Sequence, residues 1–492
     1  MKVLNRISRR RFLIGCAAFI GTKFYPTIWA KSTVTKLPIP TLIDGTDGEP
    51  VDLKIQRGMW SFNPNIGTST LGFNQGYLGP TIRTRQGTNL TLHYQNSLNE
   101  GVAVHGHGLH VPGEVDGGPQ SVIGEREEWQ PTLSIRQPAA TCWYHSHTHG
   151  KTGEQVYRGL AGMIIIDDDY SDSLNLPNRY GVDDLPIIIQ DRTFDAHGQL
   201  VYSLNNAHED GWLGEVVVIN GAVAPTTIVP AGKVRLRLLN GANARFYVIQ
   251  FSDNRTFHKI ATDGGLLEKP VPLTTMEMAP GERCEIIIDM SDTDSAELLT
   301  IFEDEYEGEG FVDTILRAFN LFNPPIPGPS LTLIVDNSLD AHTAPIPEKL
   351  NTIVRPEESE IAVTREFILE MNGGEDAHHA AMSMTINGKS MNMKVINERI
   401  QRGVWERWRV ISDQGAHPFH VHGCSFLVEQ MEGRATPPAH RGWKDIVVVD
   451  DDDWAVFIVR FDYPATDDYP YMYHCHILEH EDMGMMGQFT VG

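Results

Sequence analysis

The stretch His474–Met486 reads HCHILEHEDMGMM and gathers three histidines, one cysteine and three methionines within thirteen positions. In a β-strand, side chains two residues apart point to the same face, and adjacent side chains point to opposite faces. His474 and His476 would therefore face one site, and Cys475 would face another. Because imidazole and thiolate are common metal ligands, this stretch predicts one strand that serves two metal sites.

The spacing His-x-His recurs elsewhere in the chain. With 20 histidines in 492 residues, chance would give roughly one such pair. The chain holds five of them: His105/His107, His145/His147, His147/His149, His420/His422 and His474/His476. His147 belongs to two of these pairs, so His145 and His149 are alternative partners for it. Four pairs offer eight imidazoles, which is more than one ion accepts, so the sequence predicts several metal ions between the N-terminal and C-terminal parts of the chain.

A different ligand set surrounds Cys475. A cysteine thiolate, two imidazoles and a weakly bound methionine thioether describe a blue copper site. The sequence supplies these groups in fitting order as His417, Cys475, His480 and Met485. Through its peptide bonds to the flanking histidines, Cys475 would also give electrons a short path between the two kinds of site.

Strand patterns dominate the rest of the chain. Val234–Leu238 alternates apolar and charged residues, whereas Met163–Ile166, Ile187–Ile189 and Ile286–Ile288 are continuous apolar runs. Both patterns are typical of strands in β-sandwiches. Glycine interrupts most longer apolar windows, so long helices are not expected. We predict an all-β fold.

A weak internal repeat indicates how this fold is divided. A glycine-containing turn accompanies an amphipathic strand in three places, within residues 79–87, 220–240 and 387–410. Three related sandwich domains follow from this repeat. The predicted boundaries are a signal segment at residues 1–30 and domains at residues 31–168, 169–340 and 341–492.

The N-terminus predicts export. The first 30 residues hold six basic side chains and no acidic one. Within them, Ser8–Leu13 reads SRRRFL, is followed by an apolar stretch and resembles a twin-arginine signal. No later segment approaches the ~20 apolar residues of a membrane span. We expect a periplasmic protein, and its net charge of −24 argues against nucleic acid as a partner.

Three further cysteines play no part in the metal motifs. Cys142, Cys284 and Cys424 are too few for a disulfide framework, and we expect buried apolar thiols. The alternative is a single disulfide bond among them.

The histidine motifs together resemble those of the multicopper oxidases, and within that family those of the bacterial copper-efflux (cuprous) oxidases and laccases. The resemblance covers almost the whole chain after the signal. It rests on four segments: His105–Gly108, His145–His147, His417–Gly423 and His474–Met486. The resemblance implies three cupredoxin-like Greek-key β-sandwich domains and four copper ions.

The resemblance also implies a role for each ligand. His417, Cys475, His480 and Met485 would bind the type 1 copper, and His105 and His420 the type 2 copper. The type 3 pair would take the six remaining histidines, which are His107, His145, His147, His422, His474 and His476.

Two acidic residues occupy positions from which such enzymes deliver protons. These are Asp116 and Glu481, and the alternative role for both is to orient a ligand histidine by a hydrogen bond. A substrate copper site is also implied at Met371, Asp376 and Asp413. Gly415 stands where a further methionine ligand is usual, so this site would be incomplete.

The sequence therefore predicts a periplasmic multicopper oxidase that oxidises cuprous ion or small phenols and reduces O₂ to water, in the service of copper tolerance. Two alternatives stay open. One is a laccase that acts on organic phenols without a role in copper tolerance, and the other is a non-catalytic protein that sequesters copper. We expect a monomer that binds no nucleic acid.

Overall fold

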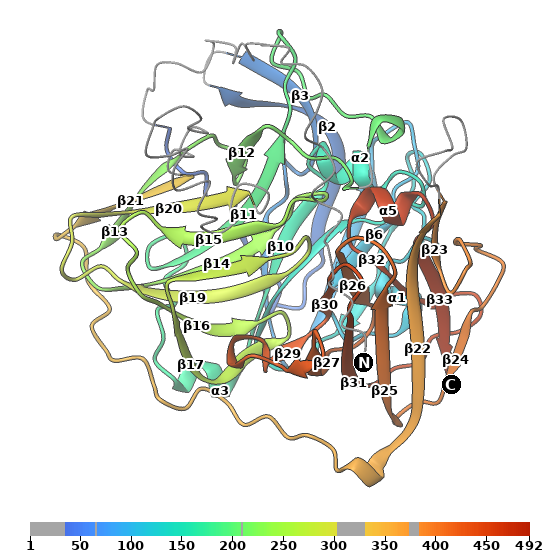
Figure 1. Ribbon diagram of the computed structural model, residues 1–492. Coiled ribbons are helices and arrows are strands. Elements are labelled where there is room, and N and C mark those ends of the chain that lie inside the picture. Colours follow the sequence, from blue (N-terminus) through green and yellow to red (C-terminus); the bar gives the residue numbers. More distant parts are fainter. Residues whose placement is uncertain (1–34, 64–65, 208–209, 303–329, 373–382) are drawn as a thin grey trace, which may run out of the picture. The chain divides into compact units, whose positions relative to one another are not determined.

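The computed structural model describes residues 35–63, 66–207, 210–302, 330–372 and 383–492 (Figure 1). Strands make up most of the regular structure within these ranges. The longest helix there, α2 (Thr152–Tyr157), has six residues. The prediction of an all-β fold without long helices is confirmed.

The first β-sandwich consists of two sheets, with strand orders β1-β4-β10-β9-β6 and β3-β2-β5-β7, and β8 pairs with β5. Leu53 of one sheet and Ile164 of the other lie in the same buried apolar cluster, so the sheets pack face to face. The strands are β1 (Leu42–Asp44), β2 (Val51–Asn63), β3 (Ile66–Phe73), β4 (Thr81–Arg85), β5 (Asn89–Asn96), β6 (Val104–His107), β7 (Glu128–Trp129), β8 (Thr132–Ser134), β9 (Ala140–Ser146) and β10 (Ala161–Asp167).

The second sandwich has sheets of order β12-β11-β14-β19-β16-β17 and β13-β21-β20-β15-β18. Leu236 and Ile249 join the two sheets in one apolar core. Its strands are β11 (Asp184–Arg192), β12 (Val216–Ile219), β13 (Thr226–Pro230), β14 (Lys233–Asn240), β15 (Tyr247–Phe251), β16 (Phe257–Thr262), β17 (Gly265–Leu273), β18 (Thr275–Met278), β19 (Arg283–Asp289), β20 (Ser295–Phe302) and β21 (Leu331–Asp336).

The third sandwich has sheets of order β23-β22-β25-β31-β27-β28, with β29 paired to β27, and β24-β33-β32-β26-β30. Phe367 and Phe419 meet in its core. Its strands are β22 (Ile361–Asn372), β23 (Ser383–Ile386), β24 (Glu398–Ile400), β25 (Trp405–Ser412), β26 (His417–Val421), β27 (Phe426–Met431), β28 (Arg434–Ala435), β29 (Trp443–Lys444), β30 (Ile446–Val449), β31 (Trp454–Arg460), β32 (Tyr471–Cys475) and β33 (Met486–Val491).

Short helices connect these strands. They are α1 (Gly113–Asp116), α2, α3 (Asp169–Ser173), α5 (Leu478–Asp482) and the 3₁₀ helices η3 (Leu204–Asn206), η5 (Glu358–Glu360) and η6 (Pro438–His440). Among the described residues, no helix is long and apolar enough to cross a membrane.

One pairing pattern occurs in all three sandwiches. A parallel pair is followed by two antiparallel neighbours in β4-β10-β9-β6, in β13-β21-β20-β15 and in β24-β33-β32-β26. The last two strands of the first and third sets carry the His-x-His pairs, whereas β15 and β20 of the second set carry no histidine. Among these equivalent strands, those of the first and third sandwiches therefore carry the histidine pairs. The exact domain boundaries of residues 31–168, 169–340 and 341–492 stay a prediction.

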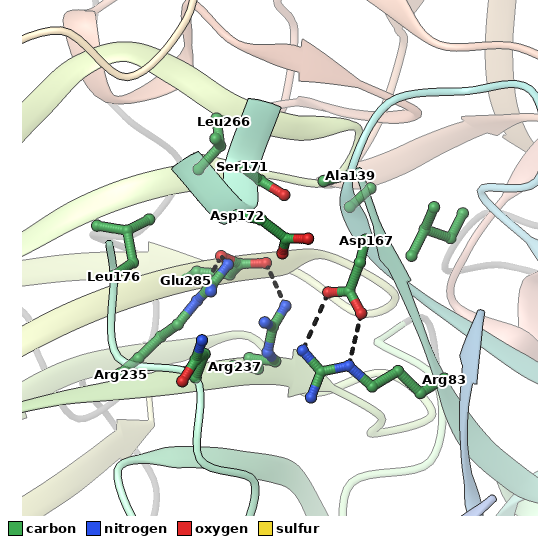
Figure 2. Close-up of a pocket in the computed structure, with 13 residues that line it drawn as sticks. Arg83, Ala139, Asp167, Ser171, Asp172, Leu176, Arg235, Arg237, Leu266 and Glu285 are labelled. Carbon is green, nitrogen blue, oxygen red and sulfur yellow. Dashed lines mark hydrogen bonds and ion pairs between the residues drawn. The ribbon is translucent and has the colours of Figure 1, made fainter. Parts of the chain in front are cut away.

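Ion pairs within each sandwich gather where the first and second sandwiches meet (Figure 2). Arg83 on β4 pairs with Asp167 at 2.6 Å. Within the second sandwich, Arg237 on β14 contacts Glu285 on β19 at 2.9 Å. Across the junction, Thr141 on β9 donates to the same carboxylate at 2.7 Å. These charges are matched within the junction, which is what burial of ionic groups requires.

The three cysteines outside the metal motifs are free and buried. Burial raises the pKa of the Cys142 and Cys284 thiols to about 12. The prediction of buried apolar thiols is confirmed for Cys142, Cys284 and Cys424.

Candidate metal centre

Four strands present the eight histidines of the predicted cluster. His105 on β6 lies directly opposite His145 on β9, and His420 on β26 lies directly opposite His474 on β32. Because the next histidine of each pair is two residues further along, it points to the same face. All eight are buried: His105, His107, His145, His147, His420, His422, His474 and His476. The first and third sandwiches thus meet through imidazoles.

The imidazole nitrogens form compact groups of three. Potential ligand atoms lie within 4.8 Å of one another in each group. The groups are His105/His420/His422, His107/His145/His476 and His147/His422/His474. The last two groups divide the six histidines predicted for the type 3 pair into two sets of three. The first group contains the two histidines predicted for the type 2 ion.

Several imidazole nitrogens in the cluster face one another at short distances. His107 Nδ1 lies 3.4 Å from His145 Nε2, and His474 Nε2 lies 3.2 Å from His422 Nε2. Some buried nitrogens have no hydrogen-bond partner, namely His105 Nε2, His420 Nε2, and Nδ1 and Nε2 of His476. A buried polar atom without a partner is costly, and a bound metal ion would supply the missing contact. The residues present therefore fit a cluster of metal ions.

Burial also favours the neutral form of several cluster imidazoles. It lowers the pKa of His107, His147 and His420 well below the ordinary value of 6.5. Neutral imidazole is the form that ligates a metal. His107, His147 and His420 are thus in the protonation state that metal binding requires at neutral pH.

Outer contacts fix the orientation of the rings. Four Nδ1 atoms lie 2.8–2.9 Å from backbone carbonyl oxygens: His105 with Asp116, His145 with Ser146, His420 with Asp445, and His474 with Cys475. Donation to a carbonyl by one nitrogen leaves Nε2 as the ligand atom. These four imidazoles are held ready before any ion arrives.

Asp116 and Glu481 touch ligand histidines directly. Asp116 Oδ2 lies 2.8 Å from His422 Nδ1. Glu481 lies 3.3 Å from His147 Nδ1 and 3.4 Å from His474 Nδ1, and it accepts a hydrogen bond of 2.7 Å from Thr152. Burial raises the pKa of Glu481 well above 4.5. These contacts suit the orientation of ligand rings, which is the alternative role that the sequence left open for both acids.

The second predicted site lies on the other side of β32. Cys475 Sγ is 3.4 Å from His417 Nδ1 and 3.6 Å from His480 Nδ1, and the two imidazole nitrogens are 3.3 Å apart. Met485 is buried in the same core, and its backbone oxygen accepts from the Cys475 amide at 3.1 Å. The alternation of β32 thus directs His474 and His476 to one group of ligands and Cys475 to another.

The predicted substrate copper site is only partly described. A β-carbon on Gly415 would lie 2.9 Å from Met371 Cε and 4.0 Å from His417 Nε2, so the Met371 side chain reaches the neighbourhood of the Cys475 site. The Asp413 amide donates to Leu369 on the same strand as Met371. Asp376 lies outside the described residues. At φ +76°, Gly415 also occupies a conformation that a methionine would adopt only with strain.

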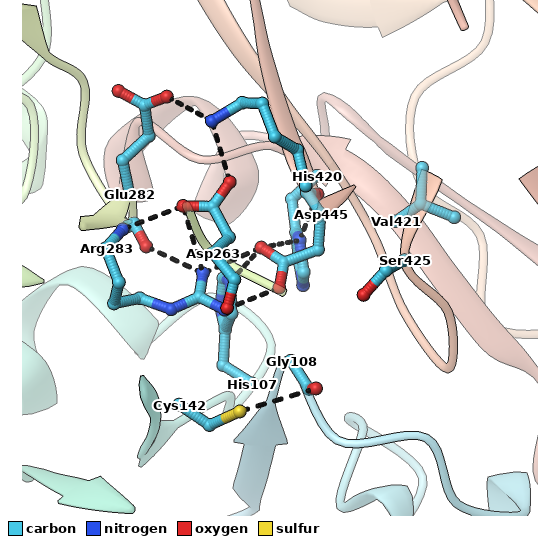
Figure 3. Close-up of polar contacts among 12 residues, drawn as sticks. His107, Gly108, Cys142, Asp263, Glu282, Arg283, His420, Val421, Ser425 and Asp445 are labelled. Atoms are coloured by element: carbon cyan, nitrogen blue, oxygen red, sulfur yellow. Dashed lines mark hydrogen bonds and ion pairs between the residues drawn. The ribbon is translucent and has the colours of Figure 1, made fainter. Parts of the chain in front are cut away.

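The structure adds groups that the sequence did not reveal (Figure 3). Asp445 Oδ1 lies 3.1 Å from His107 Nε2, so one carboxylate contacts a ligand histidine of the first sandwich while its backbone oxygen holds His420 of the third. Arg283, from the second sandwich, donates to this carboxylate at 2.7 and 2.5 Å. The second sandwich contributes no cluster histidine, yet it holds the cluster through Arg283.

Lys444 extends this network. Its ammonium lies 2.8 Å from Asp263 and 2.7 Å from Glu282, both in the second sandwich. The adjacent residues Lys444 and Asp445 therefore bind opposite charges on the same neighbour. The sequence offers one signal of this contact, which is that Lys444 and Asp445 stand side by side just before the apolar run Ile446–Val449.

Comparison with known proteins identifies the family. One model described as multicopper oxidase matches residues 54–171, and another with the same description matches residues 361–492. The chain belongs to the multicopper oxidase family. A solved bacterial laccase-like multicopper oxidase, CueO from Ochrobactrum sp., shares 35% sequence identity at a TM-score of 0.82, with 93% of this chain and 100% of that one covered. The cupredoxin-like fold is thereby confirmed for this multicopper oxidase family member.

Curated relatives carry a different kind of name. The cell division protein FtsP of Sodalis glossinidius is 38% identical over 488 residues, which cover 99% of this chain and 98% of the relative. FtsP of Escherichia coli (strain K12) is 37% identical over 490 residues, 99% of both chains. The likeness therefore extends along the whole length of proteins named for cell division.

This finding overturns the predicted oxidase function. The prediction of an enzyme that couples oxidation of cuprous ion or phenols to O₂ reduction in copper tolerance is wrong, because the full-length relatives are named as cell division proteins. The physical reason for the error is that ligand spacing encodes metal binding, whereas turnover needs more than a set of ligands. Family membership and the histidine clusters still indicate copper binding.

Proposed function

We propose that this protein is a copper-loaded, non-catalytic protein that acts in bacterial cell division. The observation that carries the proposal is the likeness to the FtsP proteins at 36–38% identity along nearly the whole of both chains. The non-catalytic copper protein was one of the alternatives open from the sequence. The division role comes from the relatives' name.

The proposed metal content is four copper ions. One would be held by His417, Cys475 and His480 with Met485, and one by His105 and His420. Two more would be held by the remaining histidines of the cluster. Support comes from the three-histidine groups and from buried nitrogens without hydrogen-bond partners. When bound, copper would supply strong bonds between strands of the first and third sandwiches.

The proposed role of the cluster is to fasten the two ends of the chain together. His147 Nε2 and His474 Nε2, from different sandwiches, lie 3.3 Å apart at a buried junction. Unpaired buried nitrogens oppose this packing, whereas shared ligation favours it. An ion that binds only the folded state stabilises that state by mass action.

The proposed location is the periplasm, reached by the twin-arginine route. Support comes from the sequence Ser8–Leu13 and from the division role of the relatives. Replacement of Arg9 and Arg10 by lysine should leave the protein in the cytoplasmic fraction. Cell fractionation with a Sec-exported control protein measures this, and unchanged export of the variant would contradict the route.

The division role is tested by complementation. In a strain that lacks its own FtsP, the wild-type chain should restore normal cell length under conditions in which the deletion strain forms filaments. The double variant His420→Ala/His474→Ala should restore it poorly, with a lower amount of folded protein on immunoblots. Failure of the wild-type chain, expressed and exported, would contradict the division role.

The copper and non-catalytic parts need a separate measurement. Purified protein loaded with copper should bind four ions per chain by metal analysis and should show no O₂ uptake above a Cys475→Ser control with cuprous ion or phenols. Fewer than four ions would contradict the metal content. Sustained O₂ uptake that depends on Cys475 would contradict the non-catalytic role.

A further inference from the structure

A cavity of about 450 Å³ lies where all three sandwiches meet, apart from the residues that face the metal groups. We call it the junction pocket. The first sandwich contributes His110 and the second contributes Gly264. The third contributes most of the wall, together with the segment that precedes β22. A volume in this range is typical of pockets that enclose a small organic ligand.

The wall of the junction pocket is aromatic. Trp405 at the start of β25, Trp443 on β29 and Tyr463 after β31 all line it. The Arg460 guanidinium lies 5.0 Å from the centre of the Trp405 ring and is neutralised by Asp462 at 2.9 Å. Arg460 therefore braces the Trp405 ring and offers no free charge to a ligand. Flat apolar walls of this kind favour a planar aromatic guest.

One cation at the mouth has no partner. Arg355 is exposed, and within the part of the chain that the structure describes it makes no hydrogen bond or ion pair. Of the acids on the same segment, Glu360 lines the pocket, and its carboxylate accepts a hydrogen bond from the Glu357 amide at 2.7 Å. Next to Arg355, Val354 is 76% exposed and also lines the pocket, so it offers an apolar surface at the rim.

The floor carries a small polar group. Ser425 Oγ lies 2.8 Å from His110 Nε2, and both side chains line the pocket. Because Gly423–Ser425 directly follow the cluster ligand His422, the floor is also the end of a metal-binding loop. A polar atom on the far edge of an aromatic ring would find its hydrogen-bond partner there.

From these features we propose that the junction pocket binds a planar aromatic carboxylate. The ring lies between the tryptophans, the carboxylate faces Arg355 and the apolar edge covers Val354. A neutral ring would use the walls alone, and an aromatic amine would meet Arg355 with like charge. The proposal does not depend on the division role or on copper.

Calorimetry with three matched probes tests the proposal on the full chain. We expect 2-naphthoate to bind one to one, and 2-naphthamide and 2-naphthylmethylamine to bind more weakly by about fivefold or more, as loss of one partly exposed ion pair predicts. Absence of saturable 2-naphthoate binding up to about 1 mM would overturn the proposal. Equal affinity for all three probes would overturn the carboxylate assignment.

Variants locate the binding. Arg355→Gln should weaken 2-naphthoate about fivefold and leave 2-naphthamide unchanged. Val354→Asp should weaken 2-naphthoate further through like charge, and both substitutions are in an exposed segment that tolerates change. Arg434→Gln, an exposed arginine that does not line the pocket, is the matched control. Equal 2-naphthoate affinity in the Arg355 variant and the control would overturn the proposal.

Discussion

Cys475 shows at the scale of one residue how the chain separates two kinds of metal site. Its thiol is buried against His417 and His480, while its neighbours His474 and His476 belong to the cluster. A single change of side chain can therefore remove one site and leave the other.

We predict that Cys475→Ser abolishes an intense blue absorption of the copper-loaded protein, because that colour arises from charge transfer between thiolate and Cu(II). Visible spectroscopy checks this, with metal analysis on the same sample. The variant should keep the copper of the histidine cluster. Persistence of the blue band would contradict the assignment of Cys475.

His110 should contribute to acid sensitivity. Burial lowers its pKa from 6.5 to about 4 in the folded protein, whereas the unfolded chain keeps the ordinary value. The unfolded state therefore binds more protons between these values, so the stabilisation is present above pH 6.5 and is lost as pH falls toward 4.

The measurement is urea unfolding of the copper-free protein at several pH values. His110→Gln should flatten the loss of stability below pH 6.5 relative to the wild type, by at most about 1.4 kcal/mol per pH unit. Glutamine can keep the contact with Ser425. Parallel curves for the two proteins would show that another group dominates.

At the scale of elements, the loop between β29 and β30 joins three sandwiches. Asp445 contacts His107, holds His420 through its backbone and receives Arg283 from β19. Removal of one partner of a buried ion pair costs about 3–5 kcal/mol, because the other charge is left unpaired.

Arg283→Met should therefore lower the thermal midpoint and the number of copper ions held by the cluster. Calorimetry and metal analysis measure the two effects. Asp445→Asn in the same chain should recover part of the stability, since it removes the unpaired charge. Arg399→Gln breaks an exposed pair with Asp467 and should change the stability little, because solvent screens such a pair. If the Arg283→Met protein were as stable as that control, the Arg283–Asp445 pair would not hold the sandwiches together.

The elements also explain what could be predicted from the sequence. Alternation along a strand is local, so the facing of His474, Cys475 and His476 could be read from their spacing. Asp445 and Arg283 are 162 positions apart and meet only after two sandwiches pack. The periodicity of apolar and polar residues along the sequence does not predict such a long-range contact. The sequence shows that Gly415 stands where a methionine ligand is usual, but the positive φ of this glycine is visible only in the structure.

At the scale of the whole molecule, copper should act as a stabilising ligand. Because the cluster joins the first and third sandwiches, ions bind the folded chain far more strongly than the unfolded one. We predict a higher thermal midpoint with copper, equivalent to about 2.7 kcal/mol when free copper exceeds Kd about a hundredfold.

Differential scanning calorimetry with and without copper checks this prediction. His107→Ala/His476→Ala should show a much smaller rise, and exposed His197, changed to alanine, serves as the control. A copper-induced rise of equal size in all three proteins would mean that the stabilising ions lie elsewhere. The cellular role could not be predicted from the sequence, because metal-ligating residues indicate which metal is bound and not what the cell uses the protein for.

The cluster takes histidines from β6 and β9 near the start of the chain and from β26 and β32 near its end. During synthesis, a nascent chain that has not yet reached His420 holds only part of each three-histidine group that spans the junction. Copper can be captured at full strength only once the last strands have emerged and docked. Full copper binding thus requires that translation and folding are complete. A truncated product would fail to retain copper.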